Sequence, residues 1–503
     1  MRYFLKKGYK KELILLSVVY LFSQGSLLFI SGRWWDDWCL YNESFDALCQ
    51  FGMELGRPSI IPIYLFTKLL PEPGYRWLTF IMFYMNMLFL YKILNNWLRL
   101  NSRDCFWICA IYGVVPTNDA RILLSIFPYT VGLFFFMAGL SLFTDILHME
   151  KVSVWKRVLS YFLFIIGFVL NSTLFFYVIV FIMIVMNIIH YRKVKRLVAF
   201  LDYLILPIAF YSVKTLFFTP YGEYEGYNEV SLNNLIKALT LIPRADWNVL
   251  HSTYINIKNT GIMVYAIGMS IILIGIIHHK NLFTVIRQKS KDNNILSKVT
   301  VYTNRFESFK TLVLGIIILS CGLFPYIVVR QKNMINTTGW VGRDSILVAW
   351  GVAMTVYAIC SIVFRKPFSE VILIYLLICS CAFFGKYYLS YQQDYYRQIG
   401  FQYQLSLHED ELENMKNIVY MNSDKSLINC QHFYQLNGNA EEVFGDQTRF
   451  FIPGLDGLKY LSKEAQDSLN RFVTSGNYHM NDYDVNYKKI DAVIDYSCSI
   501  SLA

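Results

Sequence analysis

Residues 32–58 read GRWWDDWCLYNESFDALCQFGMELGRP and follow directly on an apolar run, LILLSVVYLFSQGSLLFIS, at residues 13–31. The apolar run is long enough to cross the hydrocarbon core of a bilayer, which takes about 20 residues of helix. It is longer than the core of a signal peptide and no small-residue cleavage site follows it, so we expect it to remain as a span. The polar stretch places two adjacent carboxylates, Asp36 and Asp37, among three tryptophans at the membrane surface. This pattern indicates either a functional site or interfacial aromatic anchors beside aspartates that face water.

The composition places the whole chain in the same class. Of its 503 residues, 55% are apolar and 16% are charged, whereas a soluble domain carries about 25% charged residues. Apolar runs recur along the first 385 positions and predict a polytopic α-helical membrane protein with about eleven transmembrane helices. The predicted spans are 13–31, 76–95, 105–116, 126–145, 158–171, 174–190, 198–218, 261–278, 311–329, 344–363 and 369–385, of which 105–116 and 158–171 are short.

The charge is unevenly distributed along the chain. Residues 387–503 hold nine Lys and Arg against sixteen Asp and Glu, a net charge of −7. Because the whole chain carries +10, the preceding 386 residues carry +17. A basic membrane protein need not bind nucleic acid, because its positive charge can follow membrane topology.

Basic residues fall in alternate connections between the predicted spans. With the N-terminus in the cytoplasm, the cytoplasmic connections hold most of them, as the positive-inside tendency requires. An odd number of spans then places the acidic tail outside the cell membrane. The cytoplasmic basic residues are Arg99 and Arg103, Lys151, Lys156 and Arg157, Arg192, Lys193, Lys195 and Arg196, the run from Lys280 to Lys310, and Arg365 and Lys366.

Three outer regions are too long to be turns, and they set the domain organisation. Residues 32–75 contain two segments of helical period, roughly 38–53 and 58–70, and the second is predicted to lie in the membrane interface. Residues 219–260 form a polar and aromatic outer region. Residues 387–503 are predicted to be a small extracytoplasmic α+β domain after a transmembrane domain that covers 1–386.

The predicted outer ends of the spans carry several arginines. Transfer of a sugar to a hydroxyl group needs a base for the acceptor proton, and a carboxylate such as Asp36 or Asp37 can supply it. The reaction also needs cations where negative charge develops on a leaving phosphate, and arginine suits bidentate contact with phosphate. The candidate phosphate-binding residues are Arg57, Arg121, Arg244, Arg330 and Arg343.

Each of these arginines also has a simpler interpretation. Arg330 can extend its side chain to the lipid headgroups. Arg121 can pair with the nearby Asp119, and Arg343 can act with Asp344 as a cap for the span that follows. The ten cysteines show no CxxC pair or metal spacing, and sequence leaves their disulfide pairing open.

The order of features resembles the GT-C superfamily of integral-membrane glycosyltransferases. These have a cytoplasmic N-terminus, one span, a long first outer loop with an acidic pair and surface helices, further spans and a periplasmic C-terminal domain. The DDW at 36–38 with GRP at 56–58 is similar to bacterial members that build or modify cell-surface polysaccharides. FPY at 324–326 with W-x-x-R-D at 340–344 also resembles a segment of such proteins. The resemblance covers the whole topology through a handful of matched residues.

The resemblance implies an inverting transfer of a sugar from a polyprenyl-phosphate donor to a cell-surface glycan or lipid-linked acceptor outside the membrane. It implies that Asp36, in preference to Asp37, is the base, and that Arg343 holds the phosphate with Arg57 or Arg330. Glu54 is a further acidic candidate for the site, although its spacing matches no family pattern. The metal ligands and tail motif of the oligosaccharyltransferase branch are not recognisable, so we predict an enzyme without a metal cofactor. Its partners would be the donor, the acceptor and membrane lipids.

Other functions fit parts of the pattern. A polysaccharide polymerase or ligase of the O-antigen type would normally carry its catalytic arginines in large late periplasmic loops and have no soluble tail. A lipid or oligosaccharide flippase would carry charged residues inside its spans, and Asp202 and Lys214, both near span ends, are the clear candidates here. A receptor-like membrane protein would leave the acidic pair of the first loop without a role.

Overall fold

The chain forms two compact units. The computed structural model describes residues 9–41, 43–149, 153–191, 198–226, 230–258, 294–330, 337–415, 417–421, 433–445, 450–453 and 492–495. The first unit, here called the bundle unit, comprises Met1–Phe29, Phe45–Ile122 and Ile126–Tyr387. The second, here called the C-terminal unit, comprises Ile30–Ser44, Leu123–Ser125 and Tyr388–Ala503.

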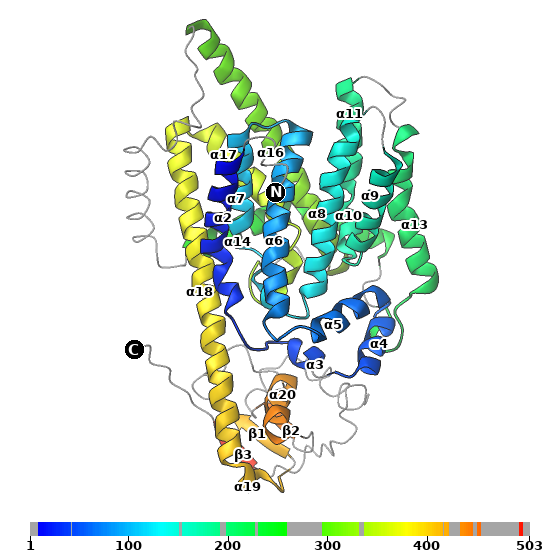
Figure 1. The fold of residues 1–503 in the computed structure, drawn as a ribbon, viewed down its shortest axis with the longest axis vertical. Helices are drawn as coiled ribbons and strands as arrows, with labels where there is room; N and C mark the ends of the chain where they lie inside the picture. Colours follow the sequence, from blue (N-terminus) through cyan, green and yellow to red (C-terminus); the bar gives the residue numbers. More distant parts are fainter. Residues whose placement is uncertain are drawn as a thin grey trace. The chain divides into compact units, whose positions relative to one another are not determined.

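The described part of the bundle unit is helical (Figure 1). Its α-helices are α2 (Lys10–Gln24), α4 (Phe45–Glu54), α5 (Ile61–Lys68), α6 (Gly74–Ile93), α7 (Ser102–Val114), α8 (Phe127–His148), α9 (Val154–Gly167), α10 (Ser172–Phe176), α11 (Val178–Tyr191), α13 (Leu201–Phe217), α14 (Leu232–Lys258), α16 (Asn294–Arg330), α17 (Ala349–Val363) and the first half of α18 (Lys366–Leu407). Short helical turns connect them: η1 (Gly25–Leu28), η2 (Pro58–Ile60), η3 (Leu94–Leu98), η4 (Asp119–Ile122), η5 (Gly222–Tyr224) and η6 (Trp340–Ser345).

Six of the described helices are long and apolar enough to cross a membrane: Lys10–Leu28, Gly74–Leu98, Phe127–His148, Ser172–Ile189, Arg305–Val329 and Phe368–Leu407. They correspond to six of the predicted spans, so the chain is a helical membrane protein. Four other predicted spans are the shorter helices α7, α9, α13 and α17. The predicted span 261–278 lies outside the described residues. The total of eleven stays a prediction.

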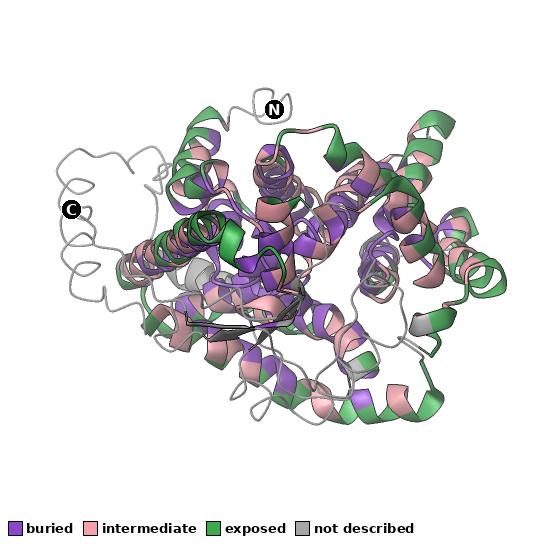
Figure 2. Cartoon of the chain, turned by 90° about the horizontal axis from the view of Figure 1, so that it is seen from below, coloured by how far each residue is buried: buried purple, intermediate pink, exposed green. Residues whose placement is uncertain are grey.

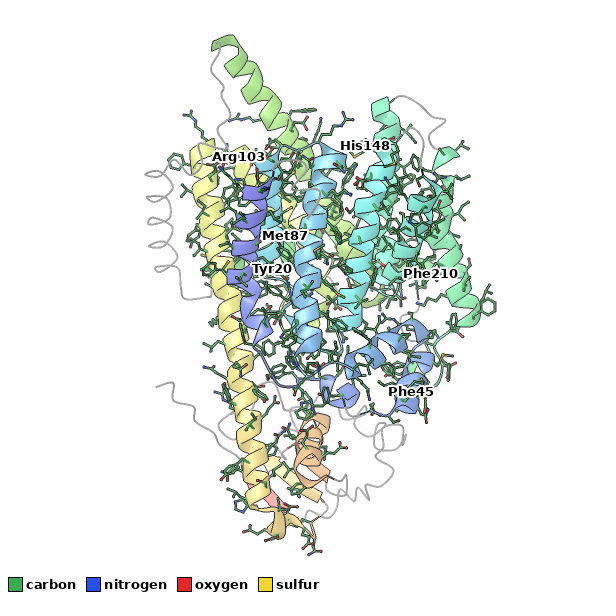
Figure 3. The ribbon with its side chains drawn as sticks, in the orientation of Figure 1. Tyr20, Phe45, Met87, Arg103, His148 and Phe210 are labelled. Carbon is green, nitrogen blue, oxygen red and sulfur yellow. The ribbon has the colours of Figure 1, made fainter. Side chains whose placement is uncertain are left out.

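Apolar side chains cover both the interior and the outer faces of the bundle unit. The interior packs around residues such as Leu16, Met87 and Leu140, which are almost fully buried, and Figure 3 labels Met87 among the side chains that fill it. Figure 2 shows exposed residues along the outer helices, and many of them are apolar, including Phe22 of α2 and Leu216 of α13. An apolar outer face beside an apolar core suits helices surrounded by lipid.

Helices α16 and α17 approach each other closely because Gly351 has no side chain. A Cβ atom at Gly351 would lie 2.4 Å from the backbone nitrogen of Leu319. Small residues at such contacts let two helix backbones pack together where the hydrophobic effect gives no driving force. The close packing holds the C-terminal end of α16 near η6, which precedes α17.

The polar and aromatic outer region predicted at 219–260 contains a long helix that the sequence analysis did not assign. Residues Leu232–Lys258 form the continuous helix α14, in spite of Pro243 in its interior. The helix is amphipathic and packs on α16 through a stripe that includes Ala238, Ala245 and Val249. The polar residues on its other face obscured that helical period in the sequence.

The first outer loop contains more helices than predicted. The predicted segment 38–53 is two helices, α3 (Asp37–Tyr41) and α4, and they belong to different units. The predicted segment 58–70 agrees with η2 and α5. Cys39 and Cys49 are free thiols, so no disulfide joins them.

The C-terminal unit combines helices with a small parallel sheet. Its described elements are α3, the second half of α18, α19 (Glu409–Leu412), β1 (Asn417–Met421), α20 (Phe433–Phe444), β2 (Phe450–Pro453) and β3 (Ala492–Asp495). The strand order is β2-β1-β3, and Val419 is in register with both Ile452 and Val493. The acidic helix α19 ends at Leu412, and β1 follows, because Ile418, Val419 and Tyr420 favour a strand.

The first-loop tryptophans take part in the packing of the C-terminal unit. Trp34 is fully buried, and its indole N–H donates to Asp394 Oδ2 at 3.1 Å. Trp38 packs against Gly438, where a Cβ atom would lie 2.6 Å from the indole ring. These two tryptophans are core residues of this unit and not anchors at a lipid surface. Arg33 joins the same structure through an ion pair with Glu442.

Candidate functional site

The Gly56-Arg57-Pro58 sequence forms the turn between α4 and η2. Gly56 has a left-handed backbone with φ of 64° and ends α4, and a Cβ atom there would lie 2.5 Å from the carbonyl oxygen of Phe218. Pro58 is the first residue of η2, a position that needs no backbone N–H donor. Arg57 is therefore held between two helix ends by residues whose backbone preferences fix the turn.

Arg57 points into the bundle unit. Its Nη2 donates to the carbonyl oxygen of Val169 at 2.7 Å, and its Nη1 donates to the hydroxyl oxygen of Tyr129 at 3.3 Å. The residue is only 8% exposed, and its guanidinium also lies over the Tyr129 ring, 5.2 Å from the centroid. A buried guanidinium needs such partners, because an unpaired charge in the interior is strongly disfavoured.

Arg343 lies on η6, which begins after Gly339, a residue with φ of 70°. The guanidinium carbon of Arg343 lies 4.0 Å from the centroid of the Trp340 ring, and its Nε lies 3.9 Å from Asp344 Oδ1. The Arg343 side chain is 21% exposed, whereas that of Asp344 is 6% exposed. Arg343 is thus more accessible than Arg57, and stacking on the Trp340 ring holds its guanidinium in place.

Both arginines influence one tyrosine, and Arg57 is the one that donates a hydrogen bond to it. The charges of both Arg57 and Arg343 act on the Tyr129 hydroxyl. Tyr326 of α16 is near the same groups, since Tyr129, Arg343 and Asp344 all act on it, and its hydroxyl is 3.0 Å from Ser172 Oγ. We call Arg57, Tyr129, Tyr326, Arg343 and Asp344 the arginine–tyrosine cluster. It lies at the end of the bundle unit where α4 and α5 are found (Figure 1).

Buried hydrogen bonds join η4 to η6 and hold the loop that carries Arg343. Asp119 Oδ2 accepts from the backbone N–H of Gly339 at 3.0 Å, and the Asn118 N–H donates to Ser345 Oγ at 2.9 Å. Ser345 in turn donates to the Gly342 carbonyl at 2.6 Å. Asp119 is completely buried, and burial raises its pKa to about 7. Its carboxyl group therefore titrates near neutral pH while it supports η6.

Among the described side chains, those of Arg121, Arg244 and Glu54 form no hydrogen bond or ion pair with this cluster. Arg121 is buried and donates to the carbonyl oxygens of Asn118 and Thr117, both at 2.7 Å, and it forms no ion pair with Asp119. Arg244 is exposed on α14. Glu54 accepts from Gln50 at 2.7 Å. Arg330 ends α16, and its side chain lies outside the described residues.

The two predicted catalytic aspartates have different surroundings within the C-terminal unit. Asp37 is almost fully buried, and its Oδ1 accepts from the backbone N–H of Ser125 at 2.9 Å and from the Ser125 hydroxyl at 3.0 Å. Asp36 is only half-buried. Burial, followed by the charges of Asp36, Glu43 and Asp37, raises the pKa of the Cys39 thiol, so the three carboxylates share one region. Asp36 is the more accessible member of the pair.

Sequence reasoning missed the two tyrosines of the cluster. Both belong to an FPY tripeptide, at 127–129 and at 324–326. Pro128 lies in the first turn of α8, and Pro325 lies near the C-terminal end of α16. The repeated tripeptide at predicted outer span ends was the signal that could have identified Tyr129 and Tyr326 together.

Metal binding and similarity to known proteins add no further assignment. Within the described ranges, no group of three or more His, Cys, Asp or Glu side chains is arranged to hold a metal ion, and the metal-free mechanism stays a prediction. Comparisons of the chain with protein-family models, with curated proteins and with solved structures found no match.

Proposed function

We propose that this protein is an integral-membrane glycosyltransferase of the GT-C type. It would move a sugar from a polyprenyl-phosphate donor to a cell-surface glycan or a lipid-linked acceptor on the outer side of the membrane. The observation that carries the proposal is that Arg57 donates to the Tyr129 hydroxyl and that the charge of Arg343 also acts on this hydroxyl. These arginines are far apart in the sequence, and both were predicted at outer span ends from charge and motifs alone.

The proposed chemistry assigns the leaving phosphate to the arginine–tyrosine cluster. As the bond between the sugar and the phosphate breaks, its electron pair moves onto the phosphate oxygen, and fixed cations stabilise the added charge. Arg343 is the accessible donor, stacked on Trp340. Arg57 is already held by Val169 and Tyr129, so little reorganisation is needed to keep its charge at the cluster.

Asp36 is proposed as the base. Its carboxylate would take the proton from the acceptor hydroxyl as the hydroxyl oxygen attacks the anomeric carbon, which inverts the configuration there. Asp37 is less suited to this role, because its Oδ1 is engaged by both donors of Ser125. We assign Asp37 to the structure of the C-terminal unit.

The experiment follows release of polyprenyl phosphate by purified protein in lipid nanodiscs supplied with a panel of polyprenyl-phosphate sugars and candidate acceptors. We expect Asp36→Asn to lower turnover by about 10²–10⁴-fold with donor binding retained. Arg343→Gln should lower turnover strongly, whereas its matched control Arg244→Gln, an exposed arginine outside the cluster, should leave it unchanged. Turnover should resist EDTA.

Two results would reject the proposal. Equal turnover in wild type, Asp36→Asn and Arg343→Gln would show that Asp36 is not the base and that Arg343 does not hold the leaving phosphate. Movement of labelled lipid between leaflets of liposomes, without any release of polyprenyl phosphate in the nanodisc assay, would favour a flippase instead. Asp37→Asn serves as a structural comparison, and we expect it to lower the unfolding temperature more than Asp36→Asn does.

A further inference from the structure

A large cavity lies at the end of the bundle unit opposite the arginine–tyrosine cluster. Figure 3 labels Arg103 and His148 at this end and Phe45 of α4 at the other. The cavity has a volume of about 1290 Å³ and is lined by residues from α7, α8, α11, η3, α16, α17 and α18. By charge asymmetry this is the predicted cytoplasmic end, so the cavity has no part in the proposed transfer reaction.

The lining of the cavity carries an excess of positive charge. Among the residues that the structure describes, five cations line it, namely Arg99, Arg103, Arg305, Lys310 and Arg365, against three carboxylates, those of Asp104, Glu307 and Glu370. The difference is a formal charge of +2 with His148 neutral. A phosphate monoester carries about −1.5 to −2 at pH 7, so one such group would balance the cavity.

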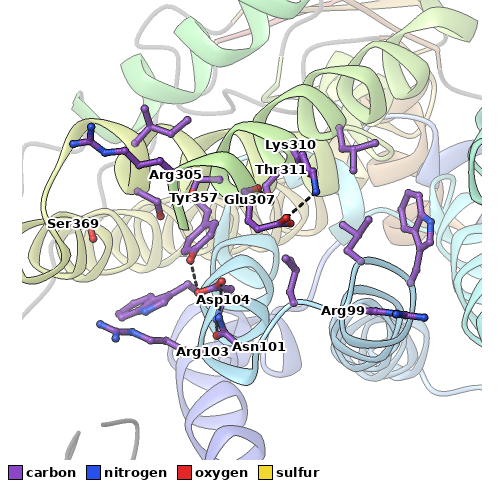
Figure 4. A pocket seen from close by; sticks show the side chains of 18 of the residues that line it. Arg99, Asn101, Arg103, Asp104, Arg305, Glu307, Lys310, Thr311, Tyr357 and Ser369 are labelled. Atoms are coloured by element: carbon purple, nitrogen blue, oxygen red, sulfur yellow. Dashed lines mark hydrogen bonds and ion pairs between the residues drawn. The ribbon is translucent and has the colours of Figure 1, made fainter. Parts of the chain in front are cut away.

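Two of the three carboxylates form ion pairs with cations of the lining, and the third accepts a hydrogen bond from a tyrosine. Figure 4 shows Glu307 paired with Lys310, at 2.7 Å, and Asp104 accepting from the Tyr357 hydroxyl, at 2.6 Å. Glu370 forms an ion pair with Arg103.

Of the three lining cations that lie outside these ion pairs, Arg99 is one, and Arg305 and Arg365 are the other two. Both side chains are exposed, and neither forms an ion pair with another residue in the described ranges. They come from different elements, since Arg305 lies on α16 and Arg365 lies between α17 and α18. Both residues line the one cavity, so it receives guanidinium groups from two separate elements.

We propose that this cavity binds a phosphate monoester through Arg305 and Arg365. Guanidinium groups match the geometry of phosphate oxygens with paired hydrogen bonds. The phosphate belongs either to a lipid headgroup, such as phosphatidic acid, or to a soluble phosphate ester. This inference goes beyond the proposed glycosyl transfer and does not depend on it.

The rival interpretation is that these arginines only contact the bulk headgroups of the inner leaflet. That interpretation predicts no difference between cavity residues and other basic residues at the same end. Lys10 and Lys11 supply the matched control, because they are exposed at the start of α2 and do not line the cavity. The double variants Arg305→Gln/Arg365→Gln and Lys10→Gln/Lys11→Gln remove the same charge.

The experiment uses full-length protein in phosphatidylcholine nanodiscs with and without phosphatidic acid. Native mass spectrometry counts the phosphatidic acid molecules that remain bound, and calorimetry measures binding of glycerol 3-phosphate in phosphatidylcholine alone. We expect the cavity double variant to bind at least about tenfold more weakly, and the lysine control to stay within about twofold of wild type. Retention of phosphatidic acid alone identifies a lipid source, and binding of glycerol 3-phosphate identifies a soluble one.

Equal binding by wild type and the cavity double variant would overturn the proposal, and so would an equal loss in the lysine control. Absence of binding of both probes to wild type would overturn it as well. Unfolding temperatures of the two double variants verify folding, and the exposed positions of Arg305 and Arg365 favour a folded product.

Discussion

The two ends of the bundle unit both carry arginines, but they hold them differently. In the arginine–tyrosine cluster, Arg57 is buried and hydrogen-bonded to Val169 and Tyr129, and Arg343 is stacked on Trp340. In the cavity at the other end, Arg305 and Arg365 are exposed. Fixed cations suit charge that develops during a reaction, whereas exposed cations around an open volume suit a ligand that arrives already charged. The difference indicates that a large cavity need not be the site of the chemistry.

The largest expected effect comes from removing both cluster arginines. We expect Arg57→Gln/Arg343→Gln to lower glycosyl transfer by roughly 10³-fold or more, since loss of a single donor to a developing oxyanion costs about 10²–10³-fold. Rates of polyprenyl phosphate release in nanodiscs measure this effect. Turnover within tenfold of wild type would show that the cluster does not stabilise the leaving phosphate.

A second prediction concerns the stability of the buried arginine. Arg57→Met would leave the Val169 carbonyl and the Tyr129 hydroxyl without their donor, and we expect the free energy of unfolding to fall by about 3 kcal/mol. Arg365→Met at the exposed cavity position should change it by less than about 0.5 kcal/mol. Unfolding in mild detergent with increasing denaturant measures both. Equal losses would mean that Arg57 and Arg365 have similar surroundings.

A third prediction uses the buried carboxyl group that supports η6. Burial raises the pKa of Asp119 from 3.8 to about 7, so the folded protein binds this proton more tightly than the unfolded chain. Its contribution to stability is present at low pH and is lost as the pH rises toward 7, by about 2 kcal/mol between pH 5 and pH 7. Asp119→Asn should lack this part of the pH dependence. An identical pH profile in the variant would contradict the prediction.

The smallest expected effect is the response to salt. Arg305 and Arg365 are exposed, so phosphate binding in the cavity should weaken a few-fold between 0.05 and 0.3 M salt as charges are screened. The hydrogen bonds of buried Arg57 should be affected much less. Calorimetric titrations at the two salt concentrations measure the first, and unfolding at the same concentrations measures the second.

Apolar runs predicted the membrane class well, because the length of a span is set by the bilayer itself. They could not reveal α14, since its amphipathic pattern over Leu232–Lys258 resembles a polar loop when only hydropathy is counted. Equally, only the family resemblance favoured Asp36 over Asp37, and the residues themselves do not show which aspartate is accessible. One is half-buried and the other is buried against Ser125, a partner 88 residues away.

The candidate site was predictable only in part for a similar reason. The GRP and W-x-x-R-D motifs pointed to Arg57 and Arg343, because glycine and proline mark tight turns at helix ends. Tyr129 and Tyr326 looked like ordinary aromatic residues of apolar runs, and only the fold brings their hydroxyl groups to the arginines. Conversely, Arg121 looked equally suitable in sequence, but its donors are bonded to the carbonyl oxygens of Thr117 and Asn118.

The most direct measurement compares the two ends of the bundle unit in one assay. Release of polyprenyl phosphate from a lipid-linked sugar donor would be followed for wild type, Arg343→Gln and Arg305→Gln/Arg365→Gln in identical nanodiscs. We predict that turnover falls about 10²–10³-fold in the Arg343 variant and stays within about twofold of wild type in the cavity variant. Full turnover in Arg343→Gln, or an equal loss in both variants, would contradict the placement of glycosyl transfer at the arginine–tyrosine cluster.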